Sequence, residues 1–245
     1  MLDNPPLLTI HRGHRRPDPA LVEAFRGAQT SHLCDAMDGR GALDHRIKPM
    51  DPANAAFAGP ALTALSYPAD VVGVFGALAE AEPGDVIIVA NDAYTGTAVV
   101  GDIVAGMMKN KGIAAFVTDG LARDRSGIVA AGMPLFAAGI NPASPAANGP
   151  GVVGAPVTVG GQHVSPGDII VGDADGVVVV PLARAEAVLD RLLAIRKAEA
   201  ATIAQVEAGL TGTDRIRALV RRAHHRPVSG SHSGIPSTAA ARIRP

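Results

Sequence analysis

Cysteine and aromatic residues are scarce in this chain of 245 residues, which has one cysteine, no tryptophan, two tyrosines and five phenylalanines. With Cys34 alone, neither an intramolecular disulfide nor a thiolate-rich metal site can form. Few aromatic side chains are present to stack on nucleic-acid bases. The core must therefore be made of alanine, valine, isoleucine and leucine, which suits closely packed layers of helices and strands.

The chain also lacks a large net charge and a long apolar run. The 22 basic residues nearly balance the 23 acidic ones, so the overall charge indicates neither a nucleic-acid nor a membrane partner. No stretch approaches the roughly 20 apolar residues that cross a bilayer, and the first residues lack a charged start followed by an apolar run. We expect a soluble, cytoplasmic protein, with neither a membrane nor a nucleic acid as its partner.

Glycine and proline are plentiful, and they divide the chain into short segments. P-G-D-V-I-I-V-A at 83–90 has the pattern of a strand that is covered on both faces. Residues 102–112 indicate a helix that is capped by Asp102, and 113–118 indicate a second buried strand. This order predicts a β-α-β unit with parallel strands and a right-handed crossover.

The flanking segments predict further elements. Asp18 is placed to cap a first helix, and Thr30 or Ser31 a second one. From 134 onward, short strands separated by glycine turns are expected, with hairpins at 160–161 and 174–176. An amphipathic helix over about 182–209 then closes the fold.

These elements predict one α/β domain over 18–210, with a mixed sheet and flanking helices. It is preceded by an irregular arm at 1–17 and followed by an extension at 211–245. From about 223 the extension has no acidic residue and few large apolar ones, so we expect it to be disordered.

Two charged groups follow the predicted strands of the β-α-β unit. Asp102 begins a helix directly after Gly101, and Arg123 and Asp124 follow the next strand. Because the carboxyl ends of parallel strands gather on one side, these groups should face one crevice. A helix N-terminus and a guanidinium suit a small carboxylate, and carboxylates suit a hard divalent cation. A surface ion pair beside an ordinary helix cap would give the same pattern, and spacing alone leaves both interpretations open.

The same motifs resemble those of a known family. G-D, twenty residues and R-D, with T-D-G before the second pair, resemble the class II pyruvate aldolases. These enzymes cleave 4-hydroxy-4-methyl-2-oxoglutarate and 4-carboxy-4-hydroxy-2-oxoadipate. The motifs also resemble a relative of theirs, the regulator of ribonuclease activity A. G-R-G-A-L at 39–43, N-G-P-G at 148–151 and P-G-D-I-I-V-G-D-A-D-G at 166–176 extend the likeness over about 20–205.

The resemblance implies roles for particular residues. Asp124 would be a ligand of Mg²⁺ or Mn²⁺, Arg123 would contact the pyruvyl group, and Asp102 would position a water for proton transfer. Arg123 and Asp124 would then diverge, one toward the substrate and one toward the metal. The backbone of the stretch from Gly101 to Val104 would hold the pyruvate carboxylate.

The backbone contribution covers four residues, namely Gly101, Asp102, Ile103 and Val104. The resemblance also implies a trimer or a dimer of trimers, with active sites between subunits. The aldolases have a glutamate at the position of Asp35, which a neighbouring subunit would contribute. Glu199 is the candidate for a second acidic residue from the neighbour, although a solvated helical glutamate is an equal alternative.

Two classes of function remain after this comparison of motifs. The first is a metal-dependent lyase that cleaves a 4-hydroxy-2-oxo acid to pyruvate, with oxaloacetate decarboxylation as a side activity. The second is a non-catalytic protein that binds and inhibits a ribonuclease. The regulator tends to lack the earlier aspartate, so the presence of Asp102 favours catalysis.

Overall fold

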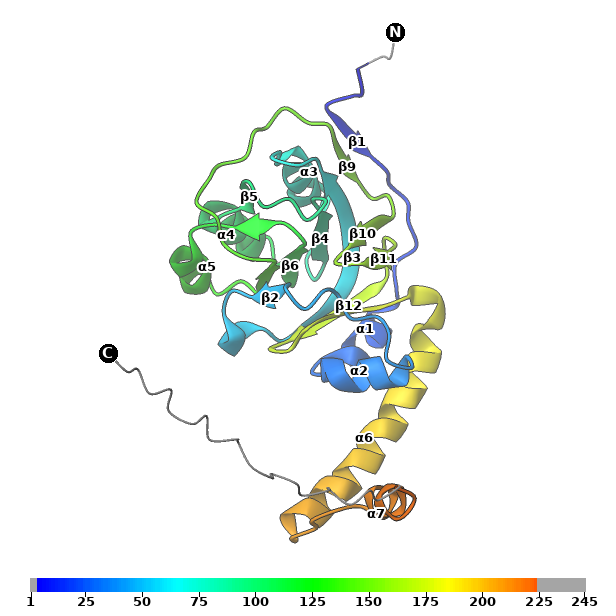
Figure 1. Ribbon diagram of the computed structural model, residues 1–245. Coiled ribbons are helices and arrows are strands. Elements are labelled where there is room, and N and C mark those ends of the chain that lie inside the picture. Colours follow the sequence, from blue (N-terminus) through cyan, green and yellow to red (C-terminus); the bar gives the residue numbers. More distant parts are fainter. Residues whose placement is uncertain (1–3, 224–245) are drawn as a thin grey trace, which may run out of the picture. The chain divides into compact units, whose positions relative to one another are not determined.

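The computed structural model describes residues 4–223, which form two compact units, one up to Glu199 and one from Ala200. The predicted disorder from about 223 falls almost wholly on residues 224–245, outside the described part. Within residues 4–223, no helix is long and apolar enough to cross a membrane. The first unit holds all of the strands, shown in Figure 1.

A nine-stranded mixed sheet forms the centre of the first unit, and the α/β class predicted from the sequence is confirmed. Its main path runs β1-β9-β3-β4-β6-β8-β2, and β12 and β13 continue it from β3. The strands are β1 (Leu8–Ile10), β2 (Lys48–Pro49), β3 (Phe57–Ser66), β4 (Val86–Ala90), β6 (Ala115–Thr118), β8 (Leu135–Ala137), β9 (Gly151–Val153), β12 (Ile169–Asp173) and β13 (Gly176–Val180).

Most of the helices are short, and the last two belong wholly or partly to the second unit. They are α1 (Pro19–Phe25), α2 (Thr30–Ala36), α3 (Val72–Glu80), α4 (Asp102–Asn110), α5 (Arg125–Ala131), α6 (Ala185–Glu207) and α7 (Asp214–Arg221), with 3₁₀ turns at Pro52–Asn54 and Leu182–Arg184. Four further short strands form two small sheets, β5 (Ala98–Val100) with β7 (Leu121–Ala122) and β10 (Val157–Val159) with β11 (Gln162–Val164).

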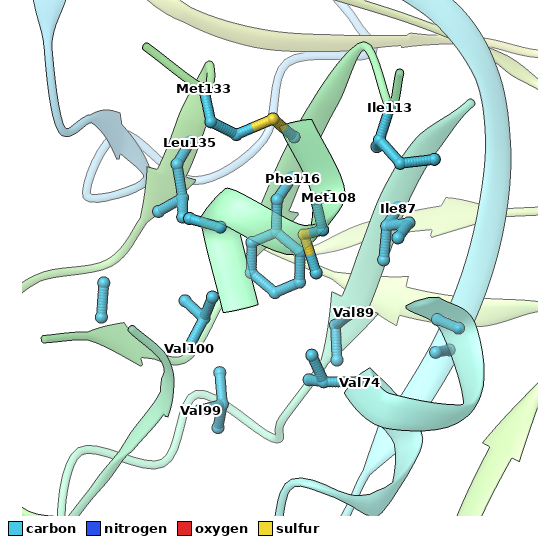
Figure 2. Close-up of a cluster of buried hydrophobic side chains, with 14 of the residues drawn as sticks. Val74, Ile87, Val89, Val99, Val100, Met108, Ile113, Phe116, Met133 and Leu135 are labelled. Carbon is cyan, nitrogen blue, oxygen red and sulfur yellow. The ribbon is translucent and has the colours of Figure 1, made fainter. Parts of the chain in front are cut away.

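The predicted β-α-β unit is present. β4 and β6 pair in parallel from Val86 opposite Ala115 onward, with α4 between them in the chain. Every residue of β4 is buried, because its two faces belong to different apolar clusters. Ile87 and Val89 pack with Phe116 in the cluster of Figure 2, and the alternate residues of β4 face the other cluster. A strand covered on both faces explains its continuous apolar sequence.

Both predicted hairpins are confirmed. β10 and β11 pair antiparallel around Gly160 and Gly161, and β12 and β13 pair antiparallel around Ala174 and Asp175. The predicted cap of the first helix is also confirmed, since Asp18 Oδ1 accepts a hydrogen bond from Ala20 N at 2.8 Å.

Two other predicted caps are wrong. The N-cap of α2 is Gln29, and Asp173 accepts hydrogen bonds from both the N–H and the hydroxyl of Thr30, each at 2.8 Å. The N-cap of α4 is Gly101, and Asp102 is the first helical residue. At the start of α2 the carboxylate of a residue distant in the sequence accepts the hydrogen bond that a local capping side chain would accept. Short-range sequence signals do not reveal such a distant partner.

Candidate active site

Two short strands bring the predicted site residues together. β5 and β7 pair in parallel, and Arg123 N donates to Val100 O at 3.0 Å. Gly101 follows β5 directly and Arg123 follows β7, so these residues lie side by side at the end of the pair. The expected neighbourhood of the two loops is confirmed at Asn91, whose N–H donates to Asp119 Oδ1 at 2.7 Å.

Two glycines lie where the charged side chains approach the backbone. A Cβ at Gly101 would lie 2.7 Å from Asp124 Oδ2 and 3.1 Å from Arg123 Nε, so both side chains would have to shift to make room for it. On α5, a Cβ at Gly127 would lie 2.3 Å from Asp102 Oδ2. The absence of side chains at these two positions lets the three charged groups gather around the start of α4.

The side chains of Arg123 and Asp124 contact each other. Arg123 Nε lies 3.2 Å from Asp124 Oδ2, and the two side chains are 36% and 45% exposed. Arg123 Nη1 also donates to Ser144 Oγ at 2.5 Å. In the isolated chain the two side chains therefore do not diverge as the resemblance implied. Both remain accessible to a ligand from solvent.

Asp124 has an unusual backbone conformation. Its φ is 56° and its ψ is 43°, in the left-handed region, at the N-cap of α5. For a residue other than glycine this costs on the order of 1 kcal/mol, and such outliers cluster at functional sites. The conformation turns the chain sharply between β7 and α5 and leaves the Asp124 carboxylate exposed at the turn.

The start of α4 offers backbone donors to an anion. The first N–H groups of a helix have no partner within it, and they carry the positive end of the helix dipole. One of them is already engaged, because Ile103 N donates to Asp102 Oδ1 at 2.7 Å. Gly101 and Val104 line a hollow of about 230 Å³ that also reaches Arg123 and Ser144. A small carboxylate in this hollow would meet both the helix start and the guanidinium.

Comparison with known proteins identifies the family. The model of the RraA-like family, described as Aldolase/RraA, matches residues 30–179. The chain belongs to the RraA-like family. A protein of Halalkalibacterium halodurans named "Putative 4-hydroxy-4-methyl-2-oxoglutarate aldolase" is 40% identical over 170 residues, which are 69% of this chain and 80% of that protein.

Solved structures of other proteins share the fold. An uncharacterized protein from Pseudomonas syringae has a TM-score of 0.71 at 27% identity, covering 81% of this chain and 97% of that one. RraAS2 from Streptomyces coelicolor, described as an unusual member of the RNase ES inhibitor RraA protein family, has a TM-score of 0.70 at 28% identity. The match covers 78% of this chain and all of that one. Relatives with catalytic and with regulatory names therefore resemble this chain.

The two acidic residues considered for a neighbouring subunit lie elsewhere in the RraA-like chain. Asp35 is exposed on α2, and Glu199 lies on α6 with its Oε2 2.5 Å from His32 Nε2. Among the described residues, neither has a recorded contact with Asp102, Arg123 or Asp124. A role in a neighbour's site stays a prediction. Within its own chain Glu199 contacts a histidine, so it is not simply a solvated glutamate on a helix.

Two contributors to the site were missed in the sequence. Ser144 holds Arg123, and it belongs to an irregular segment with no periodic pattern. Asp119, only 8% exposed, holds the loop before β5, and burial raises the pKa of its carboxyl group. Asp119 belongs to the T-D-G motif, but the sequence assigned it no role. Asn148, in the N-G-P-G motif, shapes its loop, because its N–H donates to Asp70 Oδ2 at 2.7 Å.

Proposed function

We propose that this RraA-like protein is a divalent-metal-dependent lyase that cleaves a 4-hydroxy-2-oxo acid and releases pyruvate. The observation that supports this most directly is the parallel pairing of β5 with β7. It sets the start of α4, with Asp102, against Arg123 and Asp124. The name of the Halalkalibacterium halodurans relative supports an aldolase independently.

The donors present fit a hard cation. Within residues 4–223 no three histidine, cysteine, aspartate or glutamate side chains gather into a metal cage. Mg²⁺ and Mn²⁺ prefer oxygen ligands, and Mg²⁺ typically keeps several waters beside one or two carboxylates and substrate oxygens. The half-exposed Asp124 carboxylate is such a donor. Asp124 would hold the ion, and Asp102, whose carboxylate lies beside Gly127 of α5, would orient a water for proton transfer.

The chain's own groups can carry the retro-aldol step. The 4-hydroxyl loses its proton, the bond between C3 and C4 breaks, and the electron pair passes to the C2 oxygen of the pyruvate enolate. Arg123 and the first N–H groups of α4 lie where they can bind the pyruvyl carboxylate and oppose the new charge. A water held by Asp102 accepts the hydroxyl proton, and C3 of the enolate then takes up a proton. A divalent cation at Asp124 supplies, when bound, further stabilisation of the developing negative charge.

Oxaloacetate decarboxylation would be a companion activity. Loss of CO₂ from oxaloacetate leaves the same pyruvate enolate, so the groups that oppose charge on that enolate serve both reactions. We further propose a homotrimer or a dimer of trimers, in which a neighbour completes the exposed side of the crevice. The half-exposed Arg123 and Asp124 are consistent with such a partner.

Pyruvate release tests the proposal. Purified protein receives 4-hydroxy-4-methyl-2-oxoglutarate, 4-carboxy-4-hydroxy-2-oxoadipate or oxaloacetate, with Mg²⁺ or with EDTA, in a coupled lactate dehydrogenase assay. We expect metal-dependent turnover that Arg123→Ala abolishes. Arg191→Ala is the matched control, because it removes an exposed arginine whose ion-pair partner is Asp38. Turnover that EDTA and Arg123→Ala both leave unchanged would overturn the proposal.

A second candidate function is a non-catalytic regulator that binds a ribonuclease. The likeness to the Streptomyces coelicolor protein of the RNase ES inhibitor family favours it. A gel assay of RNA cleavage by the ribonuclease, with and without this protein, separates the two functions. Unchanged cleavage in the presence of excess protein would reject the regulator.

A further inference from the structure

Charge is divided unevenly along this chain. Residues 1–213 carry 15 basic and 22 acidic side chains, whereas residues 214–245 carry seven arginines and one aspartate. The near-neutral total, from which no membrane or nucleic-acid partner was expected, conceals this division. A basic segment of this kind attracts an anionic surface or polymer. It lies beyond residues 30–179, which match the RraA-like family, so the part shared with that family does not account for it.

The helix α7 gives the start of this basic segment a defined apolar side. Ile216, Leu219 and Val220 have the spacing of one side of a helix, and they are 54%, 62% and 57% exposed. Ala218, on the opposite side, is the only residue of α7 that is not exposed. The apolar side therefore faces solvent, which reverses the usual arrangement of a helix on a protein surface.

Arginines border this apolar side on both flanks. By the repeat of the helix, Arg217 and Arg221 lie on one flank, and Arg215 and Arg222 lie on the other. All four are exposed, and the ion pair of Arg217 with Asp214, at 3.5 Å, is screened by water and salt. Apolar side chains between two rows of arginines fit the boundary of a bilayer. The apolar groups enter the hydrocarbon there, while the long arginine side chains reach the phosphate headgroups.

We propose that α7, together with the arginines that follow it in the sequence, is a docking surface for a bilayer that contains anionic phospholipids. A nucleic acid would pair with the arginines alone and leave Ile216, Leu219 and Val220 in water, so the apolar side favours a lipid. Clusters of four to eight basic residues on an amphipathic helix are typical of binding to anionic headgroups. This inference does not rest on the proposed lyase function, and its test needs no substrate.

Co-sedimentation with vesicles tests the docking surface. The full chain is mixed with vesicles of phosphatidylcholine alone, or of phosphatidylcholine and phosphatidylglycerol in equal parts. We expect binding to the anionic vesicles only, and weaker binding as NaCl is raised, because salt screens exposed charges. Equal binding to both kinds of vesicle, or binding to neither, would overturn the proposal.

Two double variants separate the contribution of charge from that of the apolar side. Arg215→Gln with Arg221→Gln removes one arginine from each flank. Binding should weaken roughly 25-fold, at about fivefold for each arginine near an anionic surface. Ile216→Ala with Leu219→Ala keeps strong helix formers but removes apolar area, and binding should weaken roughly tenfold. Vesicle binding that both variants leave unchanged would show that α7 is not the docking surface.

Arg26→Gln with Arg46→Gln is the matched control. The two side chains are 60% and 63% exposed in the first unit, so this variant removes the same charge from the chain and leaves α7 intact. It should bind the anionic vesicles as the unmodified protein does. A loss equal to that of the α7 arginine variant would mean that net charge governs binding, which contradicts the proposal.

Two other occupants of α7 give different results. If a second copy of this chain covers the apolar side, Ile216→Ala with Leu219→Ala should change the sedimentation velocity without vesicles, and vesicle binding should be absent. If a nucleic acid is the partner, single-stranded RNA should bind in a way that depends on the arginines but not on Ile216 and Leu219, again without vesicle binding. Either result would overturn lipid docking. Circular dichroism checks that each variant is folded, and the comparison of vesicles with the unmodified protein decides even where a variant is not.

Discussion

Aspartates occupy two kinds of place in this molecule. Asp70, at the start of α3, is 4% exposed, and its carboxylate accepts three backbone hydrogen bonds. Asp168 is 7% exposed and accepts from Ser165 N and Leu182 N. Asp124 is half-exposed, and among the described residues its only recorded side-chain partner is Arg123.

This difference separates aspartates that hold the fold from aspartates that are available for chemistry. The oxygens of Asp70 fix the loop at 148–149 to the start of α3, so they are not free for a ligand. The Asp124 carboxylate fixes no backbone group, and its residue has a left-handed backbone conformation. This conformation costs the fold some backbone strain. Identical substitutions at the two positions should therefore have opposite consequences.

The largest effect is expected for Asp124→Asn. Asparagine tolerates the left-handed conformation and keeps the side chain's size, but it removes the charge that would hold the cation. We expect kcat/KM for pyruvate release to fall by roughly a thousandfold, the upper range for loss of a key charge-stabilising group. The free energy of unfolding, measured with urea, should change by less than about 0.5 kcal/mol, as it does for most substitutions at exposed positions.

Calorimetric titration with Mg²⁺ completes this test, because it measures binding without catalysis. Binding retained in full by Asp124→Asn would show that the cation is held by other groups.

Asp70→Asn should show the reverse pattern. Asparagine has a single acceptor oxygen, so it leaves at least one of the three buried N–H groups facing an amide NH₂. The expected loss of unfolding free energy is about 2 to 3 kcal/mol. Urea denaturation measures it. Stability equal to that of the unmodified protein would contradict the structural role assigned to Asp70.

The sequence predicted the elements of the fold better than their connections. Runs such as V-I-I-V-A at β4 are long enough to show that a strand is buried on both faces. β5 and β7 have three and two residues, too few to show any period, so the strands that assemble the site were not predicted. The residues Asp102, Arg123 and Asp124 could be selected nevertheless, because their motif spacing is a local property.

Contacts between distant residues were the other gap. Asp173 caps α2 from 143 positions away, and no local signal distinguishes it from a turn aspartate. Ser144 reaches Arg123 from an irregular segment, where neither periodicity nor capping rules apply. Both contacts depend on the tertiary fold, which short-range patterns do not encode.

Ser144→Ala should have a moderate effect on the same site. Loss of the hydroxyl removes one hydrogen bond that orients the Arg123 guanidinium, worth about 1 kcal/mol. We expect KM for the 2-oxo acid to rise roughly fivefold, with a smaller change in kcat. Ser144→Thr keeps the hydroxyl and should restore KM. Equal KM values for the alanine variant and the unmodified protein would show that Asp124 alone orients the arginine.

The smallest effect concerns pH and the carboxyl group that holds the loop before β5. Burial raises the pKa of Asp119 above its ordinary value of 3.8. The folded state then binds more protons than the unfolded state between these two pKa values. The resulting stability is complete below about pH 4 and is lost as pH rises through the folded-state pKa.

Asp119→Asn cannot titrate, so its unfolding free energy should rise relative to that of the unmodified protein as pH increases from 4 to 7. Urea denaturation across this range measures the difference, and a difference that does not change with pH would mean that the hydrogen bond from Asn91 outweighs burial.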